Sequence, residues 1–560
     1  DHMAAYAIGI DFGTLSARAL VARIADGREM GSAEAVYAHG VLETALMDGT
    51  PLDPDWAVQV PGDYTDALRV AVRNAVRVSG VSVSDIVGLG LDVTSNTILP
   101  LTAEGKPLAE SPEFSNHPYA QVMLWKHHAA QPYADQIERA AKERGEAFLH
   151  RYGGVSAEWM LPKLMQQLAE APEIVRAADR FMEVGDWLVM LLCGQEACSE
   201  AMAGYKMFWS REAGYPSAEY LDVLMPGLSA LCRDKLAKDL YPLGHCAGTL
   251  TEGAARELGL CPGIPVAVAN IDAHVSLPGI GVTAPGELLM ILGTSTCHIM
   301  NAEEEKAVPG ICGVVRDGIV PGLYGYEAGQ SCCGDHFRWL LRNAVPESCV
   351  MEAKQRGCDL HALLSEKAGR LQPGESGLLA LDWFNGNRSV LVDMDLSGLI
   401  LGMTLQTKPE EIYRALIEAT AFGMRRILEG FEESGLPIKR VLACGGIARK
   451  NPLFMQIYAD VSGREITIGR SSQTSAMGSA MFGAVAAGRA HGGYDTIQEA
   501  AACMGGTDEV IVRPDGHSGK IYDELYREYL TLHDWFGMGG NPVMKHLRSM
   551  RRQIRKGAEI

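Results

Sequence analysis

The sequence contains no uninterrupted apolar run of about 18 residues, the length that a membrane-spanning helix needs. Paired Cys-x-x-Cys blocks are absent as well, and the 13 cysteines are odd in number and scattered along the chain. This usage is typical of a reduced intracellular protein rather than of a disulfide or zinc scaffold. No secretory signal peptide is recognisable. We therefore expect a cytoplasmic protein with no membrane partner.

Basic residues are also fewer than acidic ones. Lys and Arg number 50 against 69 Asp and Glu, which gives a formal net charge of −19. So acidic a chain is a poor partner for nucleic acid. A single nucleotide is not excluded, because a local group of backbone amides, a lysine and a metal ion is enough to bind its phosphates. The 560 residues, 47% of them hydrophobic, are enough for about two to four globular domains.

An acid follows an apolar segment in the middle of the chain. Residues 264–269 have the composition of a buried strand, and Asp272 comes directly after them. In α/β domains the loops at the carboxyl ends of such strands face the ligand cleft. An acid in that place can accept a proton from a substrate hydroxyl. An Asp that caps the next helix is the alternative interpretation of this stretch.

Two segments repeat one pattern: a strand, a turn rich in Gly, Thr and Ser, and a second strand. They are residues 6–23 and 287–300. Their turn residues are Gly13, Thr14 and Ser16 in the first copy and Gly293, Thr294 and Ser295 in the second. Glycine lets backbone amides approach an anion, and hydroxyls add donors. Two copies predict a duplicated fold whose turns grip one polyphosphate across a cleft, although either copy alone could be an ordinary hairpin.

Asp11 ends the first strand of the first copy. Mg²⁺ prefers carboxylate oxygens together with retained waters, so Asp11 can hold a hydrated Mg²⁺. A solvated acid beside a hairpin is the alternative.

Four other residues stand out by their chemistry, and the polar cluster that ends at Asn96 suits a hydroxyl-rich ligand. Asn96 closes a polar cluster after a predicted strand at 86–91, and Trp125 offers an apolar face. Lys206 lies within an aromatic segment, and Glu327 lies in a Tyr-Gly-Tyr-Glu-Ala-Gly-Gln segment. Each also has a plain interpretation as a loop residue or, for the lysine, as a solvated side chain.

A double glycine, Gly445–Gly446, follows a short predicted strand at 441–443. Asn451 then caps a helix that has Pro452 in its first turn. The bare backbone of the two glycines could receive a flat ring such as adenine, and a tight strand-to-helix turn is the alternative.

Helices are predicted at residues 61–79, 408–433 and 475–488. Thr407 and Glu410 have capping-box spacing at the start of the second helix. The third is rich in Ala and Gly, which permits close packing. An Ala-Pro-Gly turn signal within 282–286 marks a candidate domain boundary.

Together these motifs resemble the FGGY family of carbohydrate kinases, within the wider actin, hexokinase and heat-shock ATPase fold. The resemblance extends from about Ala5 to about Phe536. The family's first phosphate motif is similar to residues 8–18, which adds Arg18. Its second is similar to 292–297 and its adenosine motif to 443–451, and its catalytic acid falls on Asp272.

The resemblance implies an α/β fold of two duplicated actin-like (ribonuclease H-like) ATPase domains with a catalytic cleft between them. Residues 4–283 would form the N-terminal kinase domain, with the sugar site and the first phosphate loop. Residues 284–540 would form the C-terminal kinase domain, with the second phosphate loop and the adenosine site. Residues 541–560 would form a basic C-terminal helix or tail.

The resemblance also implies a reaction: ATP-dependent phosphorylation of L-ribulose or a related ketopentose, at the C5 hydroxyl for L-ribulose, as in L-arabinose catabolism. Asp272 would be the base, and Asp11 would hold Mg²⁺ through water. The sugar pocket would comprise Asn96, Trp125, Lys206, Asp272 and Glu327. The ATP site would comprise Gly13, Thr14, Ser16, Arg18, Gly293, Thr294, Ser295, Gly445, Gly446 and Asn451. A homodimer is expected.

Three alternatives stay open at this point. One is another pentulose kinase of the family, acting on D-ribulose or xylulose. Another is an actin-like ATPase whose output is assembly, and the third is a sugar sensor without kinase activity.

Overall fold

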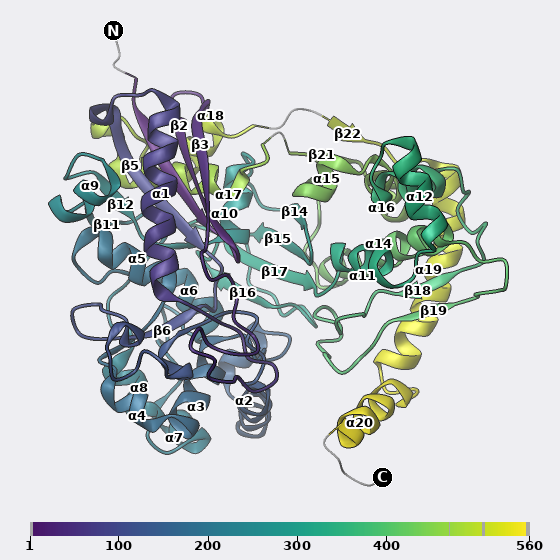
Figure 1. Ribbon diagram of the computed structural model, residues 1–560, viewed down its shortest axis with the longest axis horizontal. Coiled ribbons are helices and arrows are strands. Elements are labelled where there is room, and N and C mark those ends of the chain that lie inside the picture. Colours follow the sequence, from purple (N-terminus) through teal and green to yellow (C-terminus); the bar gives the residue numbers. More distant parts are fainter. Residues whose placement is uncertain (1–3, 470, 507–509, 556–560) are drawn as a thin grey trace.

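The computed structural model describes residues 4–469, 471–506 and 510–555. Two α/β bodies lie side by side, each built around a mixed β-sheet (Figure 1). None of the helices in these ranges is long and apolar enough to cross a membrane.

The two sheets have the same topology. The first has the order β3-β2-β1-β5-β12-β11, and the second has the order β17-β15-β14-β20-β21-β22, with β16 added outside β17. In each, the two strands of the predicted Gly/Thr/Ser hairpin pair antiparallel, and the first of them pairs parallel with the next strand inward. This strand-by-strand correspondence confirms the duplicated, actin-like fold.

The strands of the first sheet are β1 (Tyr6–Phe12), β2 (Ser16–Arg23), β3 (Glu29–Val36), β5 (Ile86–Val93), β11 (Cys246–Thr249), β12 (Pro265–Ala267) and β13 (Asn270–Ile271). Those of the second are β14 (Glu287–Leu292), β15 (Thr296–Ala302), β16 (Gly313–Arg316), β17 (Tyr324–Gln330), β20 (Arg440–Cys444), β21 (Ile466–Ile468) and β22 (Val510–Val512). The predicted strands at 6–11, 86–91 and 287–292 are confirmed.

The strand predicted at 264–269 is wrong in its length. Only β12 and the two residues of β13 are extended, because Val268 leaves the ladder and its N–H donates to His245 O at 3.1 Å. The chain then rejoins β5 beyond this kink, where Asn270 pairs with Asp92. This shift brings Asp272 to the edge of the sheet at which β1 and β5 also end.

The predicted helices are confirmed as α1 (Pro61–Ser79), α14 (Pro409–Glu433) and α17 (Thr474–Ala487). The capping box of α14 is one residue later than the predicted Thr407/Glu410 pair, since the N–H of Lys408 donates to Glu411 Oε2 at 2.7 Å. Pro409 sets this register, because proline has no N–H and favours the first helical position.

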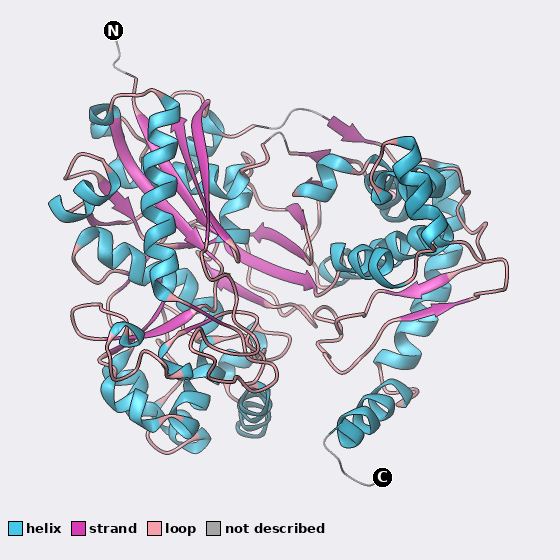
Figure 2. Cartoon of the chain, viewed as in Figure 1, coloured by secondary structure: helices cyan, strands magenta, loops and turns pink. Residues whose placement is uncertain are grey.

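A long excursion from the first sheet forms a separate apolar cluster in the lower left of Figure 2. Its small sheet has the order β4-β7-β6-β8. These strands are β4 (Val58–Gln59), β6 (Ile98–Leu101), β7 (Val122–Met123) and β8 (Arg180–Glu183). Its helices include α2 (Gln131–Arg144), α3 (Met160–Glu170), α7 (Ala218–Leu224) and α8 (Leu228–Lys235), whereas α5 (Val184–Cys193) and α6 (Glu200–Lys206) contribute to the apolar cluster of the first sheet. Two predicted sugar-site residues, Asn96 and Trp125, lie in this excursion, and Lys206 ends α6.

Helices α10 (Asp272–Gly279), α17 and α18 (Ile497–Met504) form a layer against the first sheet, although two of them come from the second half of the sequence (Figure 1). The apolar cluster of this layer also contains Leu289 and Leu442 of the second sheet. One layer is therefore shared by the two bodies.

Glycine permits this close approach. A Cβ atom on Gly90 of β5 would lie 2.1 Å from Ser479 O of α17, and one on Gly88 would lie 2.1 Å from Gly483 O. Backbone therefore packs directly on backbone, which only residues without a side chain allow.

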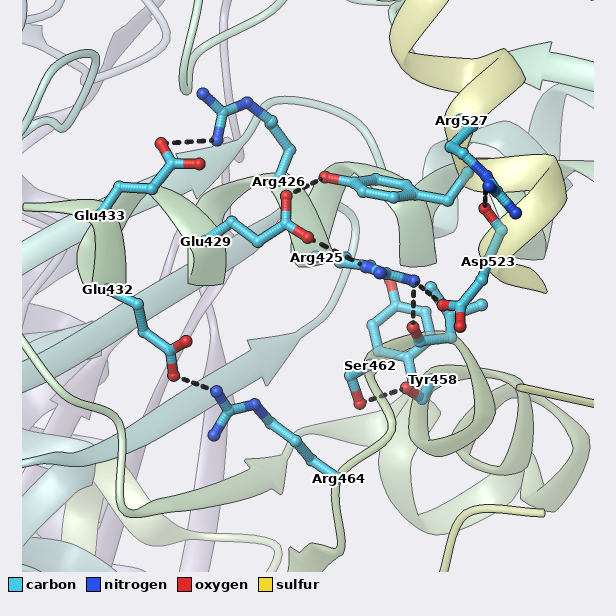
Figure 3. A network of polar contacts seen from close by, with 12 residues as sticks. Arg425, Arg426, Glu429, Glu432, Glu433, Tyr458, Ser462, Arg464, Asp523 and Arg527 are labelled. Carbon is cyan, nitrogen blue, oxygen red and sulfur yellow. Dashed lines mark hydrogen bonds and ion pairs between the residues drawn. The ribbon is translucent and has the colours of Figure 1, made fainter. Parts of the chain in front are cut away.

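The outer helices of the second body are tied by a polar network (Figure 3). Arg425 of α14 donates to Asp523 Oδ1 of α19 (Gly516–Gly537) at 2.7 Å and to Val461 O of α16 (Pro452–Ser462) at 3.1 Å. Tyr526 of α19 donates to Glu429 Oε2 at 2.6 Å. The C-terminal half of α14 is thus held against both neighbours, behind the second sheet.

The basic C-terminal helix is confirmed as α20 (Val543–Arg555), and residues 556–560 of the predicted tail lie outside the described residues. Met544 is buried, and Arg548 donates to Met394 O at 2.8 Å. Val543, Leu547 and Ile554 of this helix are exposed.

We predict that Gly90→Ala lowers thermal stability. The new methyl group would collide with Ser479 O, and overpacking of this kind costs about 1–3 kcal/mol. A Cβ atom on Gly62, in the first turn of α1, would meet nothing within 4 Å. Gly62→Ala is therefore the matched control and should be neutral or stabilising. Differential scanning calorimetry compares the two, and equal melting temperatures would show that the close approach does not matter.

Candidate active site

A cavity of about 360 Å³ lies between the two bodies and is lined by residues of both halves of the sequence. It lies where β1, β5 and β13 end together, as the paired Asp11, Asp92 and Asn270 show. The predicted residues that it brings together are Asp11, Gly13, Thr14, Asn96, Trp125, Lys206, Asp272, Gly293, Thr294, Ser295 and Glu327. Its volume is in the range of small-molecule sites.

Asp272 is the first residue of α10 and lines this cavity. Its Oδ1 accepts the N–H of Ala273 at 2.7 Å, and its carbonyl oxygen accepts the hydroxyls of Ser276 and Ser475, each at 3.1 Å. Ser475 belongs to α17, so both halves of the chain fix this residue. Burial, followed by the negative charge of Asp11, raises the pKa of Asp272 to about 7. A carboxylate with a pKa near neutrality is well matched to general-base work.

Asp11 lies at the end of β1, beside Asp92 of β5. Burial raises the pKa of Asp11, while a hydrogen bond from Asp92 and the charge of Arg18 oppose that rise. Asp11 lines the cavity, and the described residues of that lining include no histidine. This donor set fits Mg²⁺, which keeps several waters and takes one or two carboxylates.

The two Gly/Thr/Ser turns are both closed by the N–H of their glycine, but over different spans. The N–H of Gly13 donates to Ser16 O, three residues on, at 2.9 Å, and the N–H of Gly293 donates to Ser295 O, two residues on, at 3.0 Å. Both turns line the cavity, one from each body. Such paired glycine turns offer amide and hydroxyl donors to an anion from two sides.

Asn96 and Trp125 are held in place by buried groups beneath them. Asn96 has a positive φ of 63°, and its N–H donates to Glu183 Oε1 at 3.1 Å. The buried Lys163 ammonium donates to the carbonyl oxygens of Asn96 and Leu124. Trp125 in turn donates to Thr14 Oγ1 at 3.1 Å. The sugar-side loops and the first glycine turn are therefore one connected unit.

Lys206 and Glu327 line the cavity from the two halves of the chain. Lys206 ends α6 and is only 6% exposed, and Glu327 lies on β17. Glu327 Oε2 is 2.8 Å from Nε2 of the buried His274. Burial alone would raise the pKa of Glu327, but the charges of Lys206 and His274 lower it to about 2. Glu327 is therefore an ionised acceptor for hydroxyl groups.

The side chains of Ser16 and Arg18, two predicted ATP-site residues, lie outside this cavity. Ser16 Oγ donates to Glu34 Oε1 at 2.6 Å, and Arg18 Nε lies 3.6 Å from the same carboxylate oxygen. Both side chains thus pair with Glu34 of β3. Ser16 and Arg18 are two positions apart on β2, so their side chains point to the same face of the sheet.

The double glycine lies beside the second turn but outside the cavity. Gly445 has a φ of 97°, and a Cβ atom on it would lie 2.4 Å from Leu292 O, so a side chain is excluded. Gly446 begins α15 (Gly446–Lys450) and has open space above its Cα. Asn451 caps α16, as predicted, by accepting the N–H of Phe454 at 3.1 Å.

Several cavity residues were not predicted. Glu158, Cys297, Arg388 and Val392 line it, as do Ser276 and Ser475. Arg388 follows an Asn-Gly-Asn sequence, which is the only signal of a tight polar loop there. Glu158 carries no comparable signal, because it lies in an irregular segment between two apolar stretches.

Two domains of one protein family match the chain. The FGGY family of carbohydrate kinases, N-terminal domain, matches residues 6–279, and the C-terminal domain of that family matches residues 288–487. A ribulokinase of Geobacillus thermodenitrificans is 50% identical over 99% of this chain and 98% of its own length. A ribulokinase of Mycolicibacterium smegmatis is 49% identical over 98% of this chain and 96% of its own length.

Solved structures show the same fold. A ligand-bound xylulose kinase from Lactobacillus acidophilus has a TM-score of 0.78 at 16% identity, and a xylulose kinase from Rhodospirillum rubrum has 0.74 at 24% identity. Each match covers 94% of this chain and 98% of the other chain. At these sequence identities the likeness shows the fold alone.

We predict that Asp272→Asn stabilises the protein at pH 8. Since folding raises the pKa of Asp272 to about 7, the folded state binds a proton that the unfolded state has lost, and stability falls as the pH rises toward 7. The amide removes this effect and should raise the melting temperature by about 2–6 °C at pH 8.

The gain should shrink at pH 5, where the folded carboxyl is already protonated. Asp135→Asn, on the exposed face of α2, is the control and should show no such pH dependence. A melting temperature of Asp272→Asn at or below that of the wild type at pH 8 would contradict the raised pKa.

Proposed function

We propose that this chain, which belongs to the FGGY family of carbohydrate kinases, transfers the γ-phosphate of ATP to the C5 hydroxyl of L-ribulose. The products would be L-ribulose 5-phosphate and ADP. The observation that carries the proposal is the position of Asp272, with its pKa near 7, in one cavity with both glycine turns and with Lys206 and Glu327. Relatives named ribulokinase, about half identical over nearly the full length, support the choice of sugar.

In this proposal Asp272 orients the terminal hydroxyl toward the γ-phosphorus and accepts its proton as the new bond forms. The hydroxyl hardly ionises at neutral pH, so the base acts during transfer and not before it. Phosphoryl transfer depends mainly on positioning and on neutralising charge. The fixed backbone of Asp272, anchored through Ser276 and Ser475, supplies the positioning.

The phosphates of ATP would be held by the amides and hydroxyls of the two glycine turns, and adenine would lie against the open backbone at Gly446. Asp11 would hold Mg²⁺ through water, and the bound ion would supply positive charge that neutralises the phosphates. Lys206 would donate to sugar hydroxyls, Glu327 would accept from them, and Trp125 would cover an apolar edge of the sugar. The homodimer and the cytoplasmic location stay predictions.

The test is a coupled assay of ADP release with all the ketopentoses and with several pentitols. We predict the highest kcat/KM with L-ribulose, and slow ADP release without sugar, because water is a poorly held substitute for the terminal hydroxyl. A clear preference for D-ribulose or xylulose would instead indicate a sister kinase. ADP release that no sugar stimulates would contradict the proposal and favour an ATPase.

A further inference from the structure

A loop from the second body forms part of the cavity wall on the sugar side. It joins β18 (Leu379–Leu381) to β19 (Leu399–Leu401) and carries Arg388 and Val392 into the lining. Asn387 and Asp393 exchange both backbone hydrogen bonds, at 2.9 and 2.8 Å, which closes the loop at its base. The N–H of Gly329 donates to Ser389 Oγ at 3.2 Å. The loop is therefore fixed to β17 and holds Arg388 in a defined place.

The stem of Arg388 lies over the face of β17 that carries Glu327. A Cβ atom on Gly329 would lie 2.8 Å from Cδ and 3.2 Å from Nη1 of Arg388. Residues 327 and 329 point to the same side of the strand, because side chains alternate along it. The glycine at 329 thus makes room for an arginine beside Glu327.

The guanidinium of Arg388 is poorly satisfied by the protein. Within the described residues its hydrogen bonding is limited to one contact, from Nη2 to Glu158 Oε1 at 3.5 Å. An arginine has five N–H donors in a planar fork and no acceptor. The side chain is 23% exposed and lines the cavity, so its remaining donors are open to a ligand there.

Glu158 is the partner of Arg388 from the other half of the chain. Its carboxylate also lies 3.0 Å from Nε2 of His128. Burial alone would raise the pKa of Glu158, but the charges of Arg388 and His128 lower it to about 2. Glu158 is thus ionised and offers acceptors only, next to a side chain that offers donors only.

Arg388 and Glu158 line the cavity together with Trp125, Lys206 and Glu327, and they also line a neighbouring pocket with Thr294 and Ser295 of the second glycine turn. The charges that act most on the Asp272 carboxyl are those of Asp11, Glu327 and Lys206. Arg388 acts instead on Glu158 and Glu327, and on two thiols of the same wall, Cys297 and Cys312. A ketopentose with its C5 hydroxyl at Asp272 and other hydroxyls at Lys206 and Glu327 would also reach Arg388, which lies beside Glu327 on the same face of β17.

We propose that Arg388 and Glu158 bind the carbonyl-bearing end of the ketose, and so make ketoses better substrates than pentitols. The N–H donors of Arg388 would bond the C2 carbonyl oxygen, and the Glu158 carboxylate would accept the C1 hydroxyl proton. A carbonyl oxygen only accepts, which matches a guanidinium. The C2 hydroxyl of a pentitol carries an extra proton, which would compete with the C1 hydroxyl for the Glu158 carboxylate. This inference rests on the proposed function, since it takes a ketopentose as the ligand.

Steady-state kinetics of Arg388→Met test it. Loss of a charge-assisted hydrogen bond should raise KM for L-ribulose about 10- to 100-fold, while KM for ATP changes by less than about twofold. The preference for L-ribulose over ribitol should fall in parallel. Arg388→Lys keeps the charge but not the planar fork, so its KM should lie between those of the wild type and Arg388→Met.

Arg316→Met is the matched control, because Arg316 also pairs with a glutamate of the other half, Glu212 at 2.7 Å, but outside the cavity. Its kinetics should equal those of the wild type. The inference is overturned if KM for L-ribulose in Arg388→Met changes no more than in Arg316→Met. It is also overturned if L-ribulose, ribitol and ATP are all affected equally, which would indicate a general structural role.

Failure of the proposed function gives a different result. The wild type would then release no ADP with any ketopentose and would bind none in isothermal titration calorimetry, and both proposals would fall. A wild type that is active on L-ribulose, combined with an unaffected Arg388→Met, would overturn only the role of Arg388 and Glu158.

Discussion

Electrostatic repulsion among carboxylates in a partly dehydrated space is the constraint on which this structure depends. Asp272, Asp11, Glu158 and Glu327 share one cavity, and among the described residues of its lining the basic side chains are Lys206 and Arg388. Burial and like charge together hold the pKa of Asp272 near neutrality. The ionised form of Asp272 therefore lowers the stability of the folded protein. Perturbed pKa values of this kind cluster at active sites.

Duplication of one sheet explains why such a cavity exists. Each copy places a glycine turn at the end of its first strand, and the two copies present these turns to the same space. The layer formed by α10 and α17 packs on the first sheet through glycine contacts and shares its apolar cluster with the second. Ser475 of α17 then bonds the backbone of Asp272. The backbone of Asp272 is thereby fixed by both bodies rather than by one.

Local sequence signals predicted the elements of this fold well, because the glycine turns, the α16 cap at Asn451 and the apolar strands depend on near neighbours in the chain. Asp272 could be singled out as a candidate base for the same reason, because it directly follows a strand. The break between β12 and β13 was missed, since a long-range bond to His245 causes it. Arg388 and Glu158 were missed because they are 230 positions apart and meet only through the tertiary fold. Ser16 and Arg18 carry the motif pattern, yet their side chains pair with Glu34 on a neighbouring strand.

The most direct test of the central claim is the pH dependence of kcat/KM for L-ribulose at saturating ATP and Mg²⁺, which reports the essential base of the sugar-free enzyme. We predict a tenfold fall per pH unit below a pKa of about 7, and no such limb in Asp272→Asn, whose activity should be lower by about 10²–10⁴-fold. A profile that stays flat from pH 5 to pH 8, or an Asp272→Asn variant with near wild-type turnover, would contradict the account.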